Sequence, residues 1–166
     1  MEILISNEPW ETLEVDAFVC PTNSVGMMTQ HPTSRVQNLV GIPLEPVLRP
    51  HTPLAVGAAF VTSAGNMRAH YLIHVPNTDQ PGGSVQVEDV LRAASAVLVA
   101  CEARRFASIA IPLMGAFDAG IPGAEAARAI TSQLRAYKGE YPARVTLAPR
   151  TPEEHEMFEM AIEATS

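Results

Sequence analysis

The chain has 166 residues, of which 47% are hydrophobic and 17% are charged, and this composition excludes both a disordered segment and a membrane-embedded protein. Eleven basic residues stand against 18 acidic ones, a formal net charge of -7, which argues against general binding to the polyanionic backbone of duplex nucleic acid. The length suits one domain over residues 1–166 with a substantial hydrophobic core.

Predicted strands and helices alternate along the chain, which indicates an α/β protein. The run VDAFVC at 15–20 is nearly all apolar, as is typical of a strand buried on both faces. Six prolines between 21 and 56 leave room there for only a short helix, over about 34–40, inside a long irregular connection. Strand patterns occur at 2–6, 15–20, 57–63, 70–75, 108–114 and 143–149.

The second half of the chain contains the clearest helix patterns. Apolar residues recur at helical spacing over 87–101, and Ser84 is the candidate cap of this helix. Another helix is predicted over about 124–137. In the last one Thr151 is followed by a proline and, three residues on, by Glu154, which together form a helix start signal.

The two cysteines indicate neither a disulfide framework nor a metal site. Cys20 ends a buried strand and Cys101 lies on the apolar face of a helix, so both are predicted to lie in the core. No set of Cys, His and acidic residues has metal-ligand spacing, so we expect no metal and no other cofactor. The N-terminal residues lack the pattern of a secretory leader and no stretch is long enough to span a bilayer, which predicts a cytoplasmic protein without membrane contact.

Two loops are candidates for ligand binding, because ligands of open α/β sheets bind beyond the carboxyl ends of strands. The first loop, 21–32, and the second loop, 115–122, each follow a predicted strand and precede a predicted helix, whose N-terminal end favours a phosphate or carboxylate. Backbone N–H groups could hold a nucleotide diphosphate there in spite of the acidic net charge. Any α/β domain has such loops, so the residues alone leave this as one interpretation.

Three segments, in the same order, resemble the macro domain, a family that binds ADP-ribose and in some members cleaves it from proteins or nucleic acids. VDAFVCPTN at 15–23 is similar to the family's VDAIVNAAN, with the last asparagine kept as Asn23 and the first replaced by Cys20. The segment GAAFVTSAGNMRAHYLIH at 57–74 is similar to GEAVITPGGNLPARYVIH, and SIAIP at 108–112 matches a third strand. The resemblance implies a three-layer α/β/α fold in which helices cover both faces of a mixed sheet.

Both ligand loops of that family differ in this chain. The first loop keeps Gly26 alone of the glycine run, and NSVGMM at 23–28 is similar to the opening of the NCVGVMGKG-type loop of the branch that removes ADP-ribose from DNA or from carboxylate side chains. In the second loop PLMGAFD at 112–118 resembles that branch's PLIGCGLD, which puts Asp118 at the place of an acidic catalytic residue. Residues 7–9 occupy the region of the family's early adenine-binding aspartate.

The resemblance implies two catalytic candidates. Asn23 would position water or ribose and Asp118 would act in acid–base chemistry; the alternatives are a turn residue and a loop acid. Phe117 would stack on adenine or ribose, or pack the loop, and His31 is a base only if it faces the crevice rather than solvent. The expected ligand-contacting residues are Cys20, Pro21, Thr22, Asn23, Gly26, Met27, Met28, Gly115, Ala116, Phe117, Ala119 and Gly120.

Three functions remain open from the sequence. The chain is a module that binds ADP-ribose or a related nucleotide, a hydrolase of the ADP-ribosyl bond, or a macro-like scaffold that binds another ligand or a protein partner. The missing loop glycines favour the third, because side chains there hinder close approach of the backbone to a ligand. The predicted cleft and Asn23 place ADP-ribose recognition first. The expected partner is therefore ADP-ribose or an ADP-ribosylated macromolecule.

Overall fold

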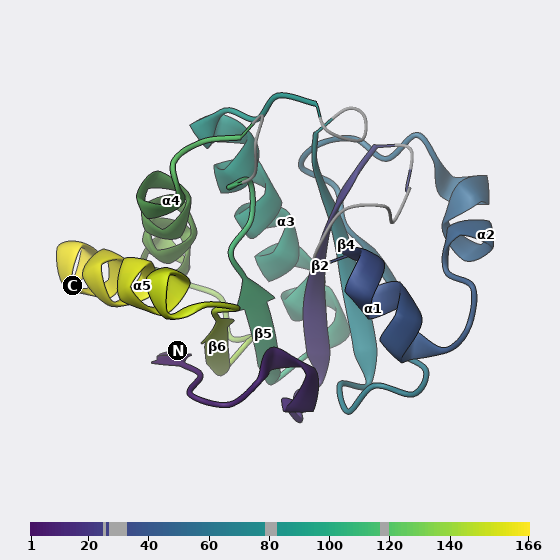
Figure 1. Cartoon of the computed structure of the whole chain (residues 1–166), viewed down its shortest axis with the longest axis horizontal. Coiled ribbons are helices and arrows are strands. Elements are labelled where there is room, and N and C mark those ends of the chain that lie inside the picture. The colour runs from purple at the N-terminus through teal and green to yellow at the C-terminus, as the bar shows by residue number, and fades with distance from the viewer. Residues whose placement is uncertain (25, 27–32, 79–82, 117–119) are drawn as a thin grey trace.

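The computed structural model describes residues 1–24, 26, 33–78, 83–116 and 120–166, and in these residues the strands form one six-stranded sheet (Figure 1). The strand order is β1-β6-β5-β2-β4-β3. Neighbouring strands are parallel except β3, which runs antiparallel to β4, so the sheet is mixed as predicted. The strands are β1 (Glu2–Ile5), β2 (Ala17–Asn23), β3 (Phe60–Ser63), β4 (Tyr71–Thr78), β5 (Ser108–Pro112) and β6 (Arg144–Ala148).

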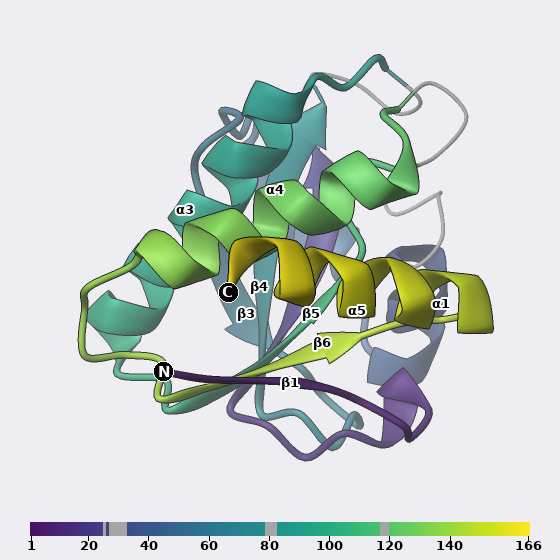
Figure 2. The ribbon, with the colours of Figure 1, turned by 90° about the vertical axis from the view of Figure 1, so that its left-hand side faces the viewer.

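Helices cover both faces of the sheet, and Figure 2 shows the strands between α3 and α4 on one side and α1 on the other. The short 3-10 helix η1 precedes β2, and its Trp10 packs into the core on the α1 side. The second one, η2, directly follows α2. The expected three-layer α/β/α arrangement is therefore present. The helices are η1 (Trp10–Thr12), α1 (Thr33–Val40), α2 (Glu45–Leu48), η2 (Arg49–His51), α3 (Val87–Arg104), α4 (Gly123–Ala136) and α5 (Pro152–Thr165).

Strand β2 shows how the sequence divides the core between the two faces. Ala17 and Val19 pack into the core shared with α3, α4 and α5. Phe18 and Cys20 pack into the core shared with α1, because successive side chains of a strand point to opposite faces. A strand with cores on both sides buries side chains on both faces, which explains the apolar run AFVC at 17–20.

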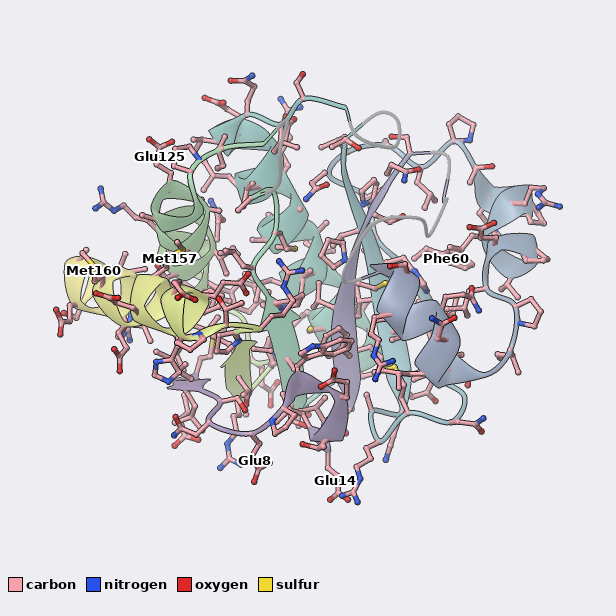
Figure 3. All side chains as sticks on the ribbon, in the orientation of Figure 1. Glu8, Glu14, Phe60, Glu125, Met157 and Met160 are labelled. Carbon is pink, nitrogen blue, oxygen red and sulfur yellow. The ribbon has the colours of Figure 1, made fainter. Side chains whose placement is uncertain are left out.

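Helix α5 has one side that faces the core and one that faces solvent. Met157 is half-buried against the core, whereas Met160, three residues later, is 61% exposed (Figure 3). Thr151 caps this helix as predicted, since its Oγ1 accepts a hydrogen bond of 3.1 Å from the Glu154 N–H.

Three sequence-based expectations need correction. Strand β2 continues past Cys20 to Asn23 because it stays paired with β4, so the first loop begins at Ser24. The cap of α3 is Gln86 rather than Ser84, and the Asp89 carboxylate accepts a 2.8 Å hydrogen bond from its N–H. The proline-rich connection contains a second helix, α2, which tolerates a proline because the first turn of a helix needs no N–H there.

In the described part of the chain, no helix combines the length and the apolar character that crossing a bilayer requires.

Candidate functional site

The candidate site lies at the carboxyl ends of β2 and β5. These strands are parallel neighbours, with Ala17 opposite Ile109, so the first and second loops leave the sheet side by side. Asn23 is the last residue of β2 and is 6% exposed. The two loops lie beyond the carboxyl ends of the strands, which is where α/β sheets bind ligands.

The first loop is anchored at its start by the end of β4. The Thr78 carbonyl accepts hydrogen bonds from both the N–H (2.9 Å) and the hydroxyl (3.3 Å) of Ser24. Gly26 follows with φ of +72°, and its N–H donates to the Asn23 carbonyl over 3.0 Å. A Cβ at this glycine would lie 3.3 Å from that of Leu48. Gly26 therefore meets a backbone requirement as well as leaving room at the loop.

The second loop is anchored at its first residue, Gly115, which packs against α3. Gly115 has φ of +80°, and a Cβ there would come within 2.6 Å of the Val90 side chain on α3. Its carbonyl accepts a hydrogen bond of 2.9 Å from the Ile121 N–H, which closes the loop. Ala116 and Gly120 are half-buried at its two ends.

A buried side chain that the sequence did not single out lies between the two loops. Asn77 is 3% exposed, and the groups around its amide assign it the orientation in which Nδ2 donates to the Thr22 carbonyl and Oδ1 accepts from the Gly115 N–H, each over 3.1 Å. The sequence predicts a loop from 77 onward, because Asn77 opens a stretch of turn-forming residues. Its partners are backbone groups, so no residue pattern identifies them.

The other predicted site residues, besides Gly26, Gly115, Ala116 and Gly120 of the two loops, fall into three groups in the structure. Pro21, Thr22 and Asn23 are strand residues at the end of β2, close to the anchored ends of both loops. Cys20 has no exposed surface and lies in the core on the α1 side, which confirms the core prediction for this cysteine. The expected contacts of Met27, Met28, Phe117, Asp118 and Ala119, and the candidate base His31, lie outside the described residues.

A cavity of about 430 Å³ lies further along the same edge, at the carboxyl ends of β1 and β6. We call it the edge cavity. In it Asn7 Oδ1 and His155 Nε2 are 3.2 Å apart, and the Arg150 guanidinium is engaged by the Glu154 carboxylate at 2.9 Å. The residues that line it are Ser6, Asn7, Glu8, Pro9, Pro149, Arg150, Thr151, Pro152 and His155.

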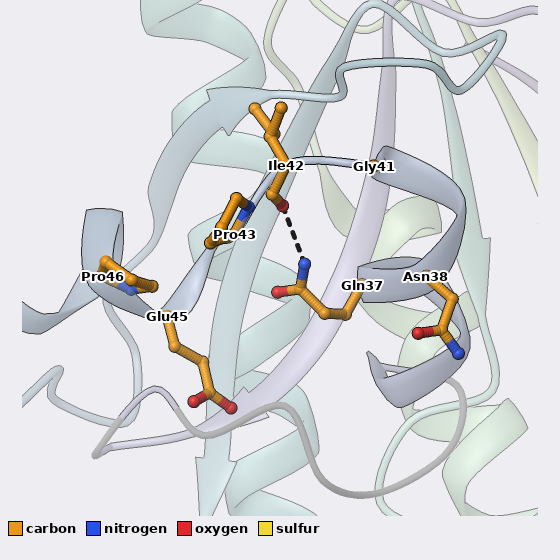
Figure 4. A pocket seen from close by; sticks show the side chains of 7 residues that line it. All are labelled: Gln37, Asn38, Gly41, Ile42, Pro43, Glu45 and Pro46. Carbon is orange, nitrogen blue, oxygen red and sulfur yellow. Dashed lines mark hydrogen bonds between the residues drawn. The ribbon is translucent and has the colours of Figure 1, made fainter.

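Another cavity, of about 510 Å³, lies beside the connection between α1 and α2 (Figure 4). Gln37 Nε2 donates to the Ile42 carbonyl over 2.8 Å, and its Oε1 accepts from the Leu44 N–H over 3.0 Å. The amide therefore stabilises the conformation of this connection.

Two buried groups with shifted pKa values are unsuited to proton transfer with a ligand. Burial lowers the pKa of His74 to about 4, and its Nε2 is hydrogen-bonded to the Thr62 hydroxyl at 2.7 Å. Burial, with the Asp16 and Glu102 carboxylates, raises the pKa of the Cys101 thiol to about 12. Both side chains have no exposed surface. Among the described residues no cluster of three or more His, Cys, Asp or Glu side chains could hold a metal ion.

The family model of the Macro domain matches residues 21–130, which include both loops and all of β3, β4 and β5. The chain belongs to the macro domain family. This confirms the family expected from the sequence, and macro domains generally bind ADP-ribose or ADP-ribosylated targets.

Relatives in sequence cover most of this macro domain. An uncharacterized protein of Aquifex aeolicus is 28% identical over 162 residues, 98% of each chain. One of Aeropyrum pernix is 27% identical over 150 residues, 90% of this chain and 79% of that protein. A third, from Mycobacterium tuberculosis, is 28% identical over 155 residues, but these make up 42% of its length. In that protein the matching part is joined to further sequence.

Solved structures confirm the fold. A point mutant of the Oceanobacillus iheyensis macrodomain with ADPR superimposes with a TM-score of 0.84 at 13% identity, covering 98% of this chain and 91% of that one. The macrodomain of Thermus aquaticus DarG gives a TM-score of 0.71 at 21% identity, covering 88% and 95%. At these identities the likeness concerns the fold.

Proposed function

We propose that this macro domain binds ADP-ribose, or a closely related nucleotide, along the carboxyl edge of β1, β6, β5 and β2. The observation that carries the proposal is the placement of Asn23 at the end of β2, beside a second loop that starts at Gly115. Family membership supports it, because macro domains generally bind ADP-ribose.

The proposed ligand lies across the edge, with its base in the edge cavity and its distal ribose near Asn23. Three strand spacings separate β1 from β2, or about 14 Å. At the cavity end, the polar atoms of Asn7 and His155 and the flanking prolines suit a base with polar edges and an apolar face.

The diphosphate lies over the second loop in this arrangement. Arg150 already pairs with Glu154, so we expect backbone N–H groups rather than this arginine to hold the phosphates. Helix α4 begins just after this loop, and its N-cap, Pro122, has no side-chain hydrogen bond to the first-turn N–H groups. An anion there is favoured by the helix dipole.

Calorimetric titration with ADP-ribose tests the proposal, with AMP and ADP as comparators. We expect micromolar affinity for ADP-ribose and a loss of about two- to tenfold in Asn23→Ala, since one hydrogen bond to a neutral ligand group contributes about 0.5–1.5 kcal/mol. Asn38→Ala, an exposed asparagine on α1, is the matched control and should leave the affinity unchanged. Absence of heat and of thermal stabilisation at millimolar ADP-ribose contradicts the proposal.

The same proteins separate the other two functions. Release of ADP-ribose from modified protein or DNA, abolished in Asp118→Ala, would make the chain a hydrolase. Binding without turnover would make it a binding module. Neither binding nor turnover would favour the scaffold that takes another ligand or a protein partner.

A further inference from the structure

Asn77 is an extra residue in the pairing of β4 with β2. Thr22 lies opposite Pro76, but the next residue, Asn23, lies opposite Thr78, so Asn77 has no partner in this register. A β-bulge of this kind bends the strand and redirects a side chain, often beside a functional site. Here the redirected side chain is the amide that reaches both loops.

The two groups held by this amide lie at the approaches to two different loops. The Thr22 carbonyl precedes Asn23 and the first loop, while the Gly115 N–H begins the second. The residue after Asn77 is Thr78, and its carbonyl accepts hydrogen bonds from both the N–H and the hydroxyl of Ser24. The carboxyl end of β4 is therefore a common anchor of the first and second loops, although it contributes no residue to either.

A shortened side chain at this position would leave both backbone groups without their partner. Asn77 is 3% exposed, and a buried N–H or C=O group without a hydrogen bond is costly, so the loops would shift to find new partners. We propose that Asn77 is a positioning residue that couples the two loops and fixes their spacing for the ligand. This inference rests on the proposed function for its effect on affinity, but the coupling itself is a property of the free protein.

The test compares Asn77→Ala and Asn77→Asp with the unsubstituted protein by amide hydrogen exchange and by ADP-ribose titration at pH 8. In Asn77→Ala we expect the Gly115 and Ser24 N–H groups to exchange at least about tenfold faster, and ADP-ribose to bind at least about tenfold more weakly. In Asn77→Asp the carboxylate still accepts from the Gly115 N–H but repels the Thr22 carbonyl. Exchange should therefore accelerate at Ser24 and stay slow at Gly115.

Thr131→Val is the matched control, because Thr131 is a fully buried polar residue of α4 whose hydroxyl bonds the Ala127 carbonyl of its own helix. It should change neither the affinity nor the exchange of the two loop amides. All titrations are made at a temperature where thermal unfolding shows each variant to be fully folded, so that loss of stability does not pass for loss of affinity.

The outcomes separate this inference from the proposed function. Unchanged ADP-ribose affinity in Asn77→Ala, or unchanged exchange at both loop amides, overturns the positioning role. If the unsubstituted protein does not bind ADP-ribose, the proposed function fails, and the exchange comparison alone decides whether Asn77 couples the loops.

Discussion

The two faces of the sheet are built differently. On the face covered by α3, α4 and α5, which we call the apolar face, the buried side chains of the helices are apolar except for Thr131 and Glu154, and α3 and α5 have side-chain hydrogen bonds at their starts. On the face covered by α1 and α2 the helices are shorter, and the buried layer includes the polar pair Thr62 and His74.

The difference concerns how the two sides of the sheet contribute to stability. The three long helices on one face cover the larger apolar core, and the other face carries short helices over a smaller one. The candidate site at the carboxyl ends of β2 and β5 adjoins both faces, because the first loop leads to α1 and the second to α4. Three predictions test this contrast, from the largest expected effect to the smallest.

Phe158→Ala tests the apolar face. Phe158 lies on α5 and has no exposed surface, so its truncation should lower the free energy of unfolding by about 3–5 kcal/mol through lost burial and a cavity. Urea unfolding measures this change. Met160→Ala, on the exposed side of the same helix, should stay within about 0.5 kcal/mol. Equal effects of the two substitutions would show that α5 does not contribute to the core as described.

His74 tests the polar face through the pH dependence of stability. Its pKa is lowered by burial from 6.5 to about 4, so as the pH falls below 6.5 the unfolded chain takes up a proton that the folded one does not. The free energy of unfolding should therefore fall by roughly 2–3 kcal/mol between pH 7.5 and 4.5.

His74→Gln provides the comparison for this effect. Its amide can accept the hydrogen bond of the Thr62 hydroxyl but does not titrate, so the variant should lack this part of the pH dependence. Urea unfolding of both proteins at the two pH values measures the difference. Parallel pH profiles would mean that His74 is protonated as easily in the folded chain as in the unfolded one.

Thr151→Ala tests the side-chain cap of α5 on the apolar face. Removing the Oγ1 that accepts from the Glu154 N–H should cost about 1 kcal/mol of stability, a typical N-cap effect. Thr165→Ala is the control at the other end of α5, where the hydroxyl bonds the Ala161 carbonyl in the last turn. Thermal unfolding should shift for Thr151→Ala alone. A larger shift for Thr165→Ala would contradict the importance of the cap.

The sequence predicted the fold because its strongest signals are local and repeated. Apolar runs marked the buried strands, helical spacing marked α3 and α4, and the start signal at Thr151 marked α5. The resemblance of 15–23, 57–74 and 108–112 to the macro domain then gave the arrangement of these elements. For the site, it identified Asn23, Gly26 and Gly115, which the structure places at the ends of two neighbouring strands.

The tertiary structure alone decided how far β2 and β4 extend and what joins their loops. Pairing with β4 extends β2 through Pro21 to Asn23 and places the bulge at Asn77. Asn7 and His155 meet in the edge cavity although 148 positions separate them in the sequence. Register and contacts of this kind depend on backbone groups that every residue carries, so they leave no pattern in the order of side chains. The sequence by itself determined the family, the central strands and the long helices α3, α4 and α5. Folding determined which backbone groups meet, and through them how the first and second loops are anchored.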